Sequence, residues 1–285
     1  RRSGHIACLA AFLPRATEKG CMIELASSDP SIVSVAPYGG TEPAFTPNPI
    51  AVGIPTSANP ILVDISASIT TNGLTGRLFS EGKKLPGDWV QDKFGQPSND
   101  PAVLFTDPPG TILPIGGREY GHKGFGLALM IEALTQGLSG LGRADPPEGW
   151  GAAVYLKVTD PDAFGGSEEF TRQTSWLAES CRSNPPARGV ESVRLPGDNA
   201  FANKAEALKN GLVNLERHIN NIRKFGLPVT VAINHFVTDS KAEVDAVLDF
   251  CKTQGVKASM CTHWSDGGEG ATELAQNVID MCEES

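Results

Sequence analysis

A short glycine-rich stretch, Gly121-His122-Lys123-Gly124-Phe125-Gly126, joins two basic side chains to three glycines directly before the apolar run Leu127–Leu134. This pattern predicts a loop that opens a buried helix. A helix start exposes unpaired N–H groups and the positive end of the helix dipole, and glycines let an anion approach them. The stretch therefore predicts a site for a carboxylate or a phosphate. A plain glycine-rich turn before a buried helix remains the alternative, because the spacing matches neither common nucleotide-binding glycine motif.

The composition is that of a globular protein. The chain has 285 residues, of which 40% are hydrophobic and 20% charged, and its formal net charge is -9. This length allows one large domain or two ordinary ones with a real core. The acidic balance argues against nucleic acid and anionic membrane partners. No apolar run approaches the roughly 20 residues of a membrane span, so we expect a cytoplasmic protein.

The six cysteines are scattered, without a C-x-x-C pair or a Cys/His cluster. This spacing predicts reduced, mostly buried thiols and no metal site. The first residue, Arg1, follows no methionine and stands inside what reads as an ongoing segment, so we expect a missing N-terminal portion.

The elements expected before residue 200 alternate between strands and helices. Short β-branched runs bounded by Pro, Asn and Ser predict buried strands at 48–55 and 61–65. Further strands are expected at 22–26, at 152–159, where apolar and polar residues alternate, and at 190–195. The expected helices are 1–19, broken near Pro14, together with 122–138 and 167–181, and residues 80–120 are expected to be loop-rich.

The pattern becomes more regular after about residue 200. An amphipathic helix over 203–224 places Leu208, Leu212, Leu215, Ile219 and Ile222 on one face. A fully buried strand at 229–234, a helix at 240–253 capped by Ser240 or Asp239, a strand at 256–261 and a helix at 271–283 follow. This order predicts a right-handed βαβ unit with flanking helices.

Residues 1–198 resemble the malate/L-lactate dehydrogenase family that lacks a Rossmann domain, the group that includes ureidoglycolate and sulfolactate dehydrogenases. The resemblance rests on motifs that follow the family's order. They are Ser3-Gly4-His5-Ile6, Ala36-Pro37-Tyr38-Gly39-Gly40, Asn48-Pro49-Ile50-Ala51, Leu62-Val63-Asp64-Ile65-Ser66, Gly121–Gly126 and Leu195-Pro196-Gly197-Asp198. The resemblance implies a homodimer that exchanges a hydride between NAD or NADP and a small 2-hydroxy or 2-oxo acid.

The resemblance also implies where the cofactor binds. The candidate residues are Ser3, Asp92, the loop Tyr38-Gly39-Gly40-Thr41-Glu42 and the turn Pro196-Gly197-Asp198. Asp198 or Glu42 could accept hydrogen bonds from ribose hydroxyls. The alternatives are a plain turn at 38–42 and a strand-ending turn at 196–198.

The catalytic candidates are His5, His122 and Lys123. His122 and Lys123 would hold a substrate carboxylate or a cofactor phosphate, and a solvated loop is the alternative. His5 either lines the site or caps and packs a helix. The family's acid/base histidine belongs to a region N-terminal to this chain, so the resemblance implies an incomplete catalytic set.

Residues 203–285 resemble an internal fragment of formate–tetrahydrofolate ligase. The matching stretches are Asn214–Asn221, Phe225–Val229, Ala232–Phe236, Thr238-Asp239, Cys261–Trp264 and Gly267–Gly270. Trp264 matches the tryptophan that stacks on the folate ring, which implies tetrahydrofolate as a ligand, and a tryptophan packed on its own helix is the alternative. The ligase's phosphate loop is absent from the sequence, so ATP-dependent ligation is not expected.

Taken together, the sequence predicts an α/β chain. A partial, mixed-sheet, non-Rossmann dehydrogenase fold over 1–198 is followed by a small βαβ layer over 203–285. Three functions stay open, namely a hydroxy-acid dehydrogenase, a folate-binding fragment and a non-catalytic chimera. Pieces cut from larger sheets expose edges and apolar faces, so we expect a homo-oligomer.

Overall fold

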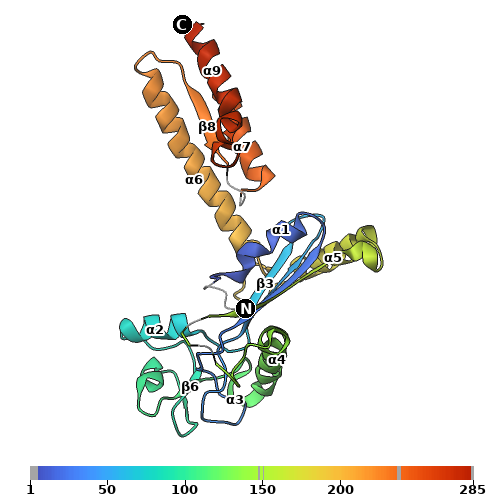
Figure 1. Cartoon of the computed structure of the whole chain (residues 1–285), viewed down its shortest axis with the longest axis vertical. Helices are drawn as coiled ribbons and strands as arrows, with labels where there is room; N and C mark the ends of the chain where they lie inside the picture. Colours follow the sequence, from blue (N-terminus) through green and yellow to red (C-terminus); the bar gives the residue numbers. More distant parts are fainter. Residues whose placement is uncertain (1–5, 147, 150, 236–238, 284–285) are drawn as a thin grey trace. The chain divides into compact units, whose positions relative to one another are not determined.

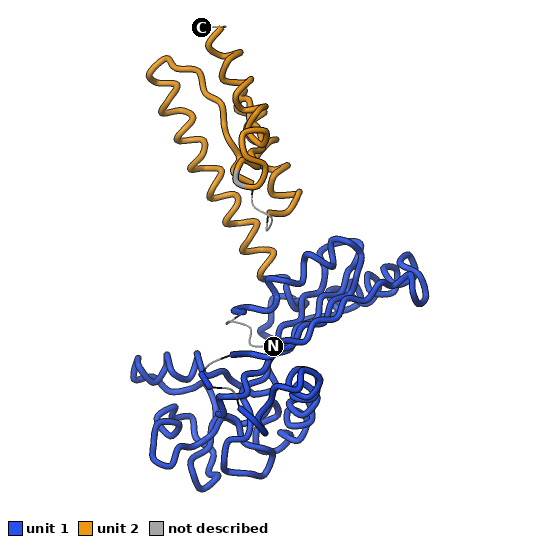
Figure 2. Tube along the Cα trace, in the orientation of Figure 1, with its two compact units in different colours: residues 1–199 blue, residues 200–285 orange. Residues whose placement is uncertain are grey.

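The computed structural model describes residues 6–146, 148–149, 151–235 and 239–283. The chain forms two compact units, residues 1–199 and 200–285 (Figure 2). Antiparallel strands dominate the first unit and a parallel pair lies in the second. The expected α/β class is confirmed.

A four-stranded antiparallel sheet organises the first unit. Its strands are β1 (Met22–Ser28), β2 (Pro49–Ile54), β3 (Ile61–Ser66) and β7 (Ala153–Thr159), in the order β3-β2-β1-β7. Leu25 stands opposite Ala51 on one side and Leu156 on the other. These runs form strands because each is flanked by turn residues and pairs with a neighbour in the ladder, although Leu156 and Val158 of β7 stay 59% and 50% exposed. The four expected strands at these positions are confirmed.

Two short helical turns cover one face of this sheet. They are η1 (Leu9–Phe12) and α1 (Pro14–Thr17), so the expected helix over 1–19 is broken next to Pro14. Leu13 is fully buried against the sheet. A Cβ at Gly53 would lie 2.8 Å from Ile23 Cγ2 and 2.9 Å from Thr17 Cγ2, so only glycine fits beneath these turns.

A loop-rich layer adjoins the sheet (Figure 1). It holds a small sheet of β4 (Val90–Gln91), β5 (Pro97–Ser98) and β6 (Thr111–Ile112), with η2 (Pro101–Phe105) and α3 (Gly117–Tyr120). The loop-rich character of 80–120 is confirmed. The sequence patterns did not predict α2 (Asn72–Ser80), whose Thr71 cap accepts a hydrogen bond from the Leu74 N–H.

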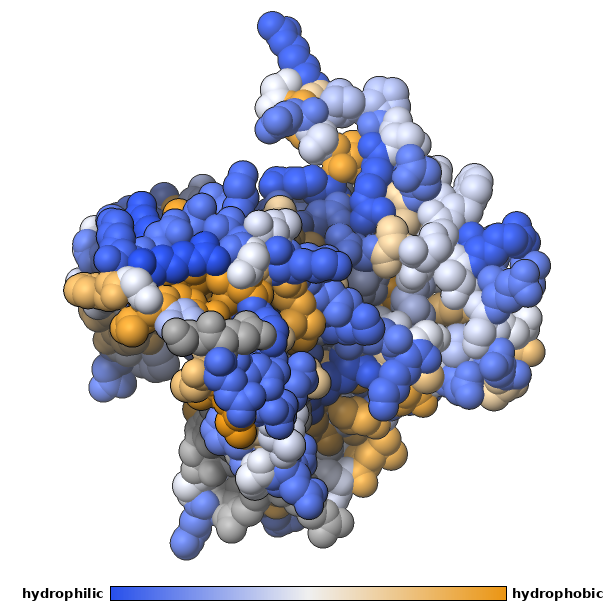
Figure 3. Space-filling view, turned by 90° about the horizontal axis from the view of Figure 1, so that it is seen from above, coloured by the Kyte–Doolittle hydropathy of each residue, from blue (hydrophilic) through white to orange (hydrophobic). Residues whose placement is uncertain are grey.

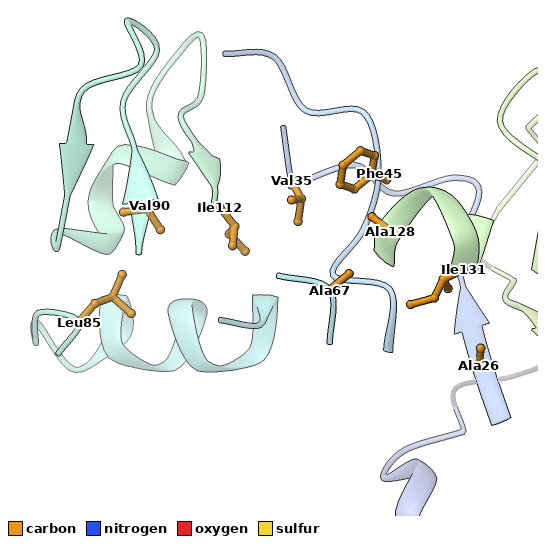
Figure 4. Packing of buried hydrophobic residues seen from close by; sticks show 9 residues of the cluster. All are labelled: Ala26, Val35, Phe45, Ala67, Leu85, Val90, Ile112, Ala128 and Ile131. Atoms are coloured by element: carbon orange, nitrogen blue, oxygen red, sulfur yellow. The ribbon is translucent and has the colours of Figure 1, made fainter. Parts of the chain in front are cut away.

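The core lies between these layers. Figure 4 shows Ala128 and Ile131 of α4 (His122–Glu132) near Ala26 of β1, Ala67 and Phe45. A π-helical turn, η3 (Ala133–Gly137), continues α4, and the expected helix over 122–138 is thus confirmed with a bulge. The helix is buried on one face only, since Leu129 and Met130 are 52% and 47% exposed.

The last part of the first unit contains η4 (Pro161–Ala163) and α5 (Ser167–Arg182), which confirms the expected helix over 167–181. Thr174 Oγ1 donates a hydrogen bond to the Pro55 carbonyl at 2.7 Å. The strand expected at 190–195 is wrong, because this segment is irregular and joins no ladder. The Leu62 N–H donates to the Pro196 carbonyl, so the following turn, rather than the segment itself, contacts β3.

The second unit has the expected alternation of helices and strands. It contains most of α6 (Asp198–Arg223), then β8 (Thr230–Asn234), α7 (Lys241–Thr253), β9 (Lys257–Cys261), α8 (His263–Asp266), η5 (Gly267–Ala271) and α9 (Thr272–Glu283). β8 pairs with β9 in parallel, with Ala232 opposite Ser259. Ser240 and Glu243 form a capping box at the start of α7, which confirms Ser240 as the cap.

Burial in the second unit is shallower than the sequence suggests. Ile219 of α6 is 1% exposed, but Ile222 is 41% exposed and leaves the apolar face. β8 was expected to be fully buried and is half-exposed, because a two-stranded sheet covers little of each strand. Only Cys251 and Cys261 of the cysteines are buried, so the expectation of mostly buried thiols is wrong.

Apolar side chains reach the surface in both units. Figure 3 shows apolar residues in orange between hydrophilic ones in blue. Phe164, Leu138 and Phe225 are 79%, 73% and 81% exposed. None of the helices in the described part of the chain is long and apolar enough to cross a membrane. The expected homo-oligomer stays a prediction.

The core position of Ile131 allows a direct test. Ile131→Ala should lower the free energy of unfolding by about 3 kcal/mol, because it removes a fully buried side chain from a close-packed cluster. Met130→Ala on the same helix is the matched control and should change it by less than about 0.5 kcal/mol. Urea unfolding measures both. Equal losses in the two variants would contradict this location of the core.

Candidate functional site

Tyr38 and His122, from two distant motifs, lie side by side. Their rings meet edge to face, with centroids 5.7 Å apart and planes 73° apart. The Tyr38 hydroxyl donates to the Glu119 carbonyl at 3.4 Å. Lys123 Nζ lies 5.4 Å from the centre of the Tyr120 ring. The structure thus joins the 38–42 loop to the start of α4 and leaves two basic side chains exposed there.

The start of α4 is less open to an anion than the glycine pattern suggests. α3 precedes it almost without a break, since Gly121 has a helical φ of -60°. The Gly124 N–H donates to the Ile115 carbonyl at 3.1 Å, and the Phe125 N–H donates to the Gly121 carbonyl. A Cβ at Gly124 would lie 2.3 Å from the Ile115 nitrogen. Gly124 therefore serves close backbone packing. Its N–H is already bonded to the Ile115 carbonyl, which fits a glycine-rich turn better than an anion site.

A cavity of about 370 Å³, here called the Tyr38 cavity, lies beside this contact. Its lining includes Tyr38, Gly39, Gly40, Thr41, Gln91, Phe94, Gly95, Gly117 and Arg118. Gly39 has a φ of +85°, which glycine adopts freely. Gln91 Nε2 fixes the loop by donating to the Gly40 carbonyl at 2.8 Å and to Thr111 Oγ1 at 2.9 Å.

Two acidic candidates lie near this cavity without lining it. Glu42 is exposed. Asp92 Oδ1 accepts from the N–H groups of Phe94 and Gln96 at 2.8 and 2.9 Å, so it closes its own turn. Asp92 therefore stabilises its own turn, a role that the sequence did not predict.

The turn Pro196-Gly197-Asp198 is docked on β3. Gly197 has a φ of +100°, and a Cβ there would lie 3.1 Å from Leu62 Cβ. Asp198 Oδ1 accepts from Arg182 Nη2 at 2.8 Å, and Oδ2 accepts from the Leu195 N–H at 2.8 Å. The hydrogen bond from Arg182 holds the pKa of Asp198 below its ordinary value. A ribose hydroxyl would have to share a carboxylate that is already engaged.

A second cavity, of about 310 Å³, is lined by Asp29, which the sequence did not predict as a site residue. This Asp29 cavity is lined by Ile6, Ala7, Leu9, Ser27, Ser28, Asp29, Ile32, Thr46, Pro49, Asn72 and Ala152. Asp29 is 8% exposed, and its Oδ1 accepts from the Ser31 N–H and Oγ at 2.8 and 2.7 Å. Its Oδ2 is buried without a hydrogen-bond partner among the described residues. A ligand that donates a hydrogen bond would remove this desolvation cost.

Sequence signals for Asp29 were weak, because Ser27-Ser28-Asp29-Pro30 reads as an ordinary turn. Ser3 and His5 lie outside the described residues, and Ile6, which completes their motif, lines the Asp29 cavity. The side chain of Trp264 also lies outside the description, although its backbone belongs to α8. Within the described ranges no three or more His, Cys, Asp or Glu side chains could hold a metal ion.

The comparison with known families decides the class of the chain. The malate/L-lactate dehydrogenase family model matches residues 1–223. The chain belongs to this family. Its fold is that of solved relatives: it is 29% identical to a dehydrogenase from Sinorhizobium meliloti, with a TM-score of 0.59 over 73% of this chain and 60% of that one. It is 25% identical to delta1-piperideine-2-carboxylate reductase from Pseudomonas syringae, with a TM-score of 0.58 over 88% of this chain and 66% of that one.

A second family matches the end of this dehydrogenase-family chain. The formate–tetrahydrofolate ligase model matches residues 188–285. The ligase from Pelagibacter ubique is 57% identical over 88 residues, which are 31% of this chain but 16% of that enzyme. Both expected resemblances are thus confirmed. The two matches overlap over 188–223, so the whole of α6 fits both family patterns.

The docked turn of this dehydrogenase-family chain gives a pH-dependent prediction. Because the pKa of Asp198 is lowered in the folded state, its contribution to stability is present above the unfolded pKa and is lost as the pH falls through the folded pKa. Asp198→Asn should lower the free energy of unfolding by about 1 kcal/mol at pH 7. It should also flatten the decline below about pH 4. Thermal unfolding between pH 3 and 7 measures this, and parallel curves for the two proteins would contradict it.

Proposed function

We propose that the chain binds NAD or NADP and exchanges a hydride with a small 2-hydroxy or 2-oxo acid. Family membership supports this class of reaction. The observation that carries the site is the unpartnered Oδ2 of Asp29, which is buried at a cavity where the ends of two family motifs, Ile6 and Pro49, meet.

The residues of the Asp29 cavity fit the nicotinamide end of such a cofactor. Ribose hydroxyls and a carboxamide N–H are hydrogen-bond donors, and Asp29 Oδ2 is an acceptor in need of one. The hydroxyls of Ser27, Ser28 and Thr46 lie on residues that line the same cavity. When bound, the nicotinamide ring supplies the hydride acceptor or donor. The chain then has to bind it, exclude water and orient the acid.

Positive charge for the anionic groups lies at the Tyr38 cavity. Arg118 lines it, and His122 contacts Tyr38, while Lys123 follows in the sequence. These side chains could bind a substrate carboxylate or a cofactor phosphate. His5, which directly precedes Ile6 in the sequence, remains our sequence-based candidate for a catalytic residue that lines the site. We place Gly39, Gly40 and Thr41 at the backbone wall of the anion site.

Asp29→Asn tests the cofactor site. The change keeps the size of the side chain but replaces one acceptor oxygen by a donor, so the affinity for NADH or NADPH should fall about tenfold. Fluorescence titration with each dinucleotide measures it. Asp162→Asn is the control, since Asp162 is an exposed carboxylate that accepts from the Ser167 N–H, and its affinity should equal wild type. Wild-type protein that is folded yet binds neither dinucleotide would overturn the proposal.

Turnover needs its own measurement. The wild-type chain is incubated with the dinucleotide that binds and with a series of 2-oxo acids, and oxidation of the reduced cofactor is followed by absorbance. Binding without turnover would retain the cofactor site and reject the reaction.

We propose folate binding by the second unit as a second candidate function. Identity of 57% to a formate–tetrahydrofolate ligase over 88 residues favours it. The parallel strands β8 and β9 end next to each other at Asn234 and Cys261, and Thr262 directly follows β9. Gly270 packs closely there, since its Cβ would lie 2.7 Å from Thr262 Oγ1.

Tetrahydrofolate should quench the fluorescence of Trp264, because stacked rings exchange excitation energy at contact distance. The quenching should disappear in Trp264→Ala. Trp176→Phe is the control, because Trp176 is 68% exposed in the first unit, and it should leave the quenching intact. Equal quenching in wild type and Trp264→Ala would reject this candidate.

A further inference from the structure

Glu132, at the end of α4, accepts hydrogen bonds from three separate segments. Its Oε1 accepts from Ser28 Oγ, Asn48 Nδ2 and Arg143 Nη2, each at 2.9 Å. Arg143 Nε adds bonds of 3.2 Å to both carboxylate oxygens. The side chains of Arg143 and Glu132 are only 20% and 18% exposed. This carboxylate is therefore a junction between β1, the segment before β2 and the chain after η3.

Arg143 extends the junction to the backbone beside Asp29. Its Nη1 donates to the Ile32 carbonyl at 2.7 Å, and its Nη2 donates to Ser28 Oγ at 3.3 Å. Gln136 Nε2, carried by the π-helical turn, donates to the same Ser28 Oγ at 2.8 Å. The segment from Ser28 to Ile32 is thus held at both ends, with Asp29 between them.

Asn48 forms the opposite attachment. It is fully buried and has a φ of +51°, a left-handed conformation that costs free energy in a residue with a Cβ. Its Nδ2 donates to Glu132, and its N–H donates to Thr46 Oγ1 at 3.2 Å. Since Thr46 and Pro49 line the Asp29 cavity, Glu132 supports this wall too.

We propose that Glu132 and Arg143 are positioning residues for the Asp29 cavity. They hold its two walls, Ser28–Ile32 and Thr46–Pro49, at a fixed separation and so keep Asp29 Oδ2 directed at the ligand. The identity of that ligand rests on the proposed function, whereas the ordering of the two walls does not depend on it.

A stabilising role alone does not account for the pair. A buried ion pair costs desolvation, and apolar residues of similar volume often give equal stability. The donors that converge here come from residues flanking one cavity, whereas the apolar cluster of the same unit is filled without them. The arrangement thus fixes geometry that close packing of apolar side chains would leave adjustable.

The double variant Glu132→Leu/Arg143→Leu separates geometry from stability, because it removes both charges and leaves neither unpaired. Hydrogen exchange of the Ser31 and Asn48 amides should become at least tenfold faster, since their acceptors Asp29 Oδ1 and Thr46 Oγ1 lie in the two walls. The Leu113 amide, which donates to the Trp89 carbonyl, is the internal reference and should stay unchanged. Affinity for the dinucleotide should fall at least tenfold.

Val90→Ala is the matched control for a general loss of stability. Val90 is fully buried in β4, away from both walls, so its truncation should speed exchange at Leu113 as much as at Ser31 and Asn48. Glu132→Gln serves as the second variant should the double variant not fold, with the same local expectation. Exchange at Ser31 and Asn48 that rises no more than at Leu113 would overturn the inference. Failure of wild type to bind any dinucleotide would instead reject the proposed function, and the exchange data would still decide the positioning role.

Discussion

The first unit depends on the carboxylate of Glu132, which is largely removed from water and has to find hydrogen-bond donors inside the protein. A buried carboxylate is tolerated only where donors surround it, and here Ser28, Asn48 and Arg143 provide them. The same helix that carries Glu132 packs Ala128 and Ile131 into the core and begins at His122 beside Tyr38. One helix therefore links the core, the walls of the Asp29 cavity and the basic edge of the Tyr38 cavity.

The two cavities differ in charge, and this difference constrains what each can bind. The Asp29 cavity presents a carboxylate oxygen without a partner among the described residues, so it favours hydroxyl or amide donors and disfavours a second carboxylate. The Tyr38 cavity is lined by glycine backbone and Arg118, which suits an anion. The two cavities therefore favour different chemical groups, hydroxyl or amide donors at Asp29 and an anion beside Tyr38.

Local sequence patterns predicted the strands β1, β2, β3 and β7 because each is a short run with apolar residues that is bounded by turn residues. The patterns assigned Tyr38 and His122 to one candidate site, but they did not predict that the two rings are in contact. They could not predict the role of Glu132, since its partners Ser28 and Asn48 lie 104 and 84 residues away in the sequence. They could not predict Asp29 either, because its sequence context is typical of a turn and its cavity is lined by distant segments. The strand expected at 190–195 failed although β3 is an edge strand of the sheet. The segment does not pair with β3, and the Pro196 carbonyl in the following turn accepts from the Leu62 N–H instead.

The α6 helix shows how a sequence can satisfy two families at once. Both family patterns include residues 198–223, and the helix needs only an apolar stripe on one face to be accepted by either. Leu208, Leu212 and Leu215 are half-buried and Ile219 is fully buried, at the three- and four-residue spacings that a helix requires. Such a stripe carries little information about its partner, because any apolar surface of matching shape covers it. A helix of this kind is therefore a place where segments of different origin can be joined without a break in secondary structure, while the cavities, which depend on exact polar partners, stay within one unit.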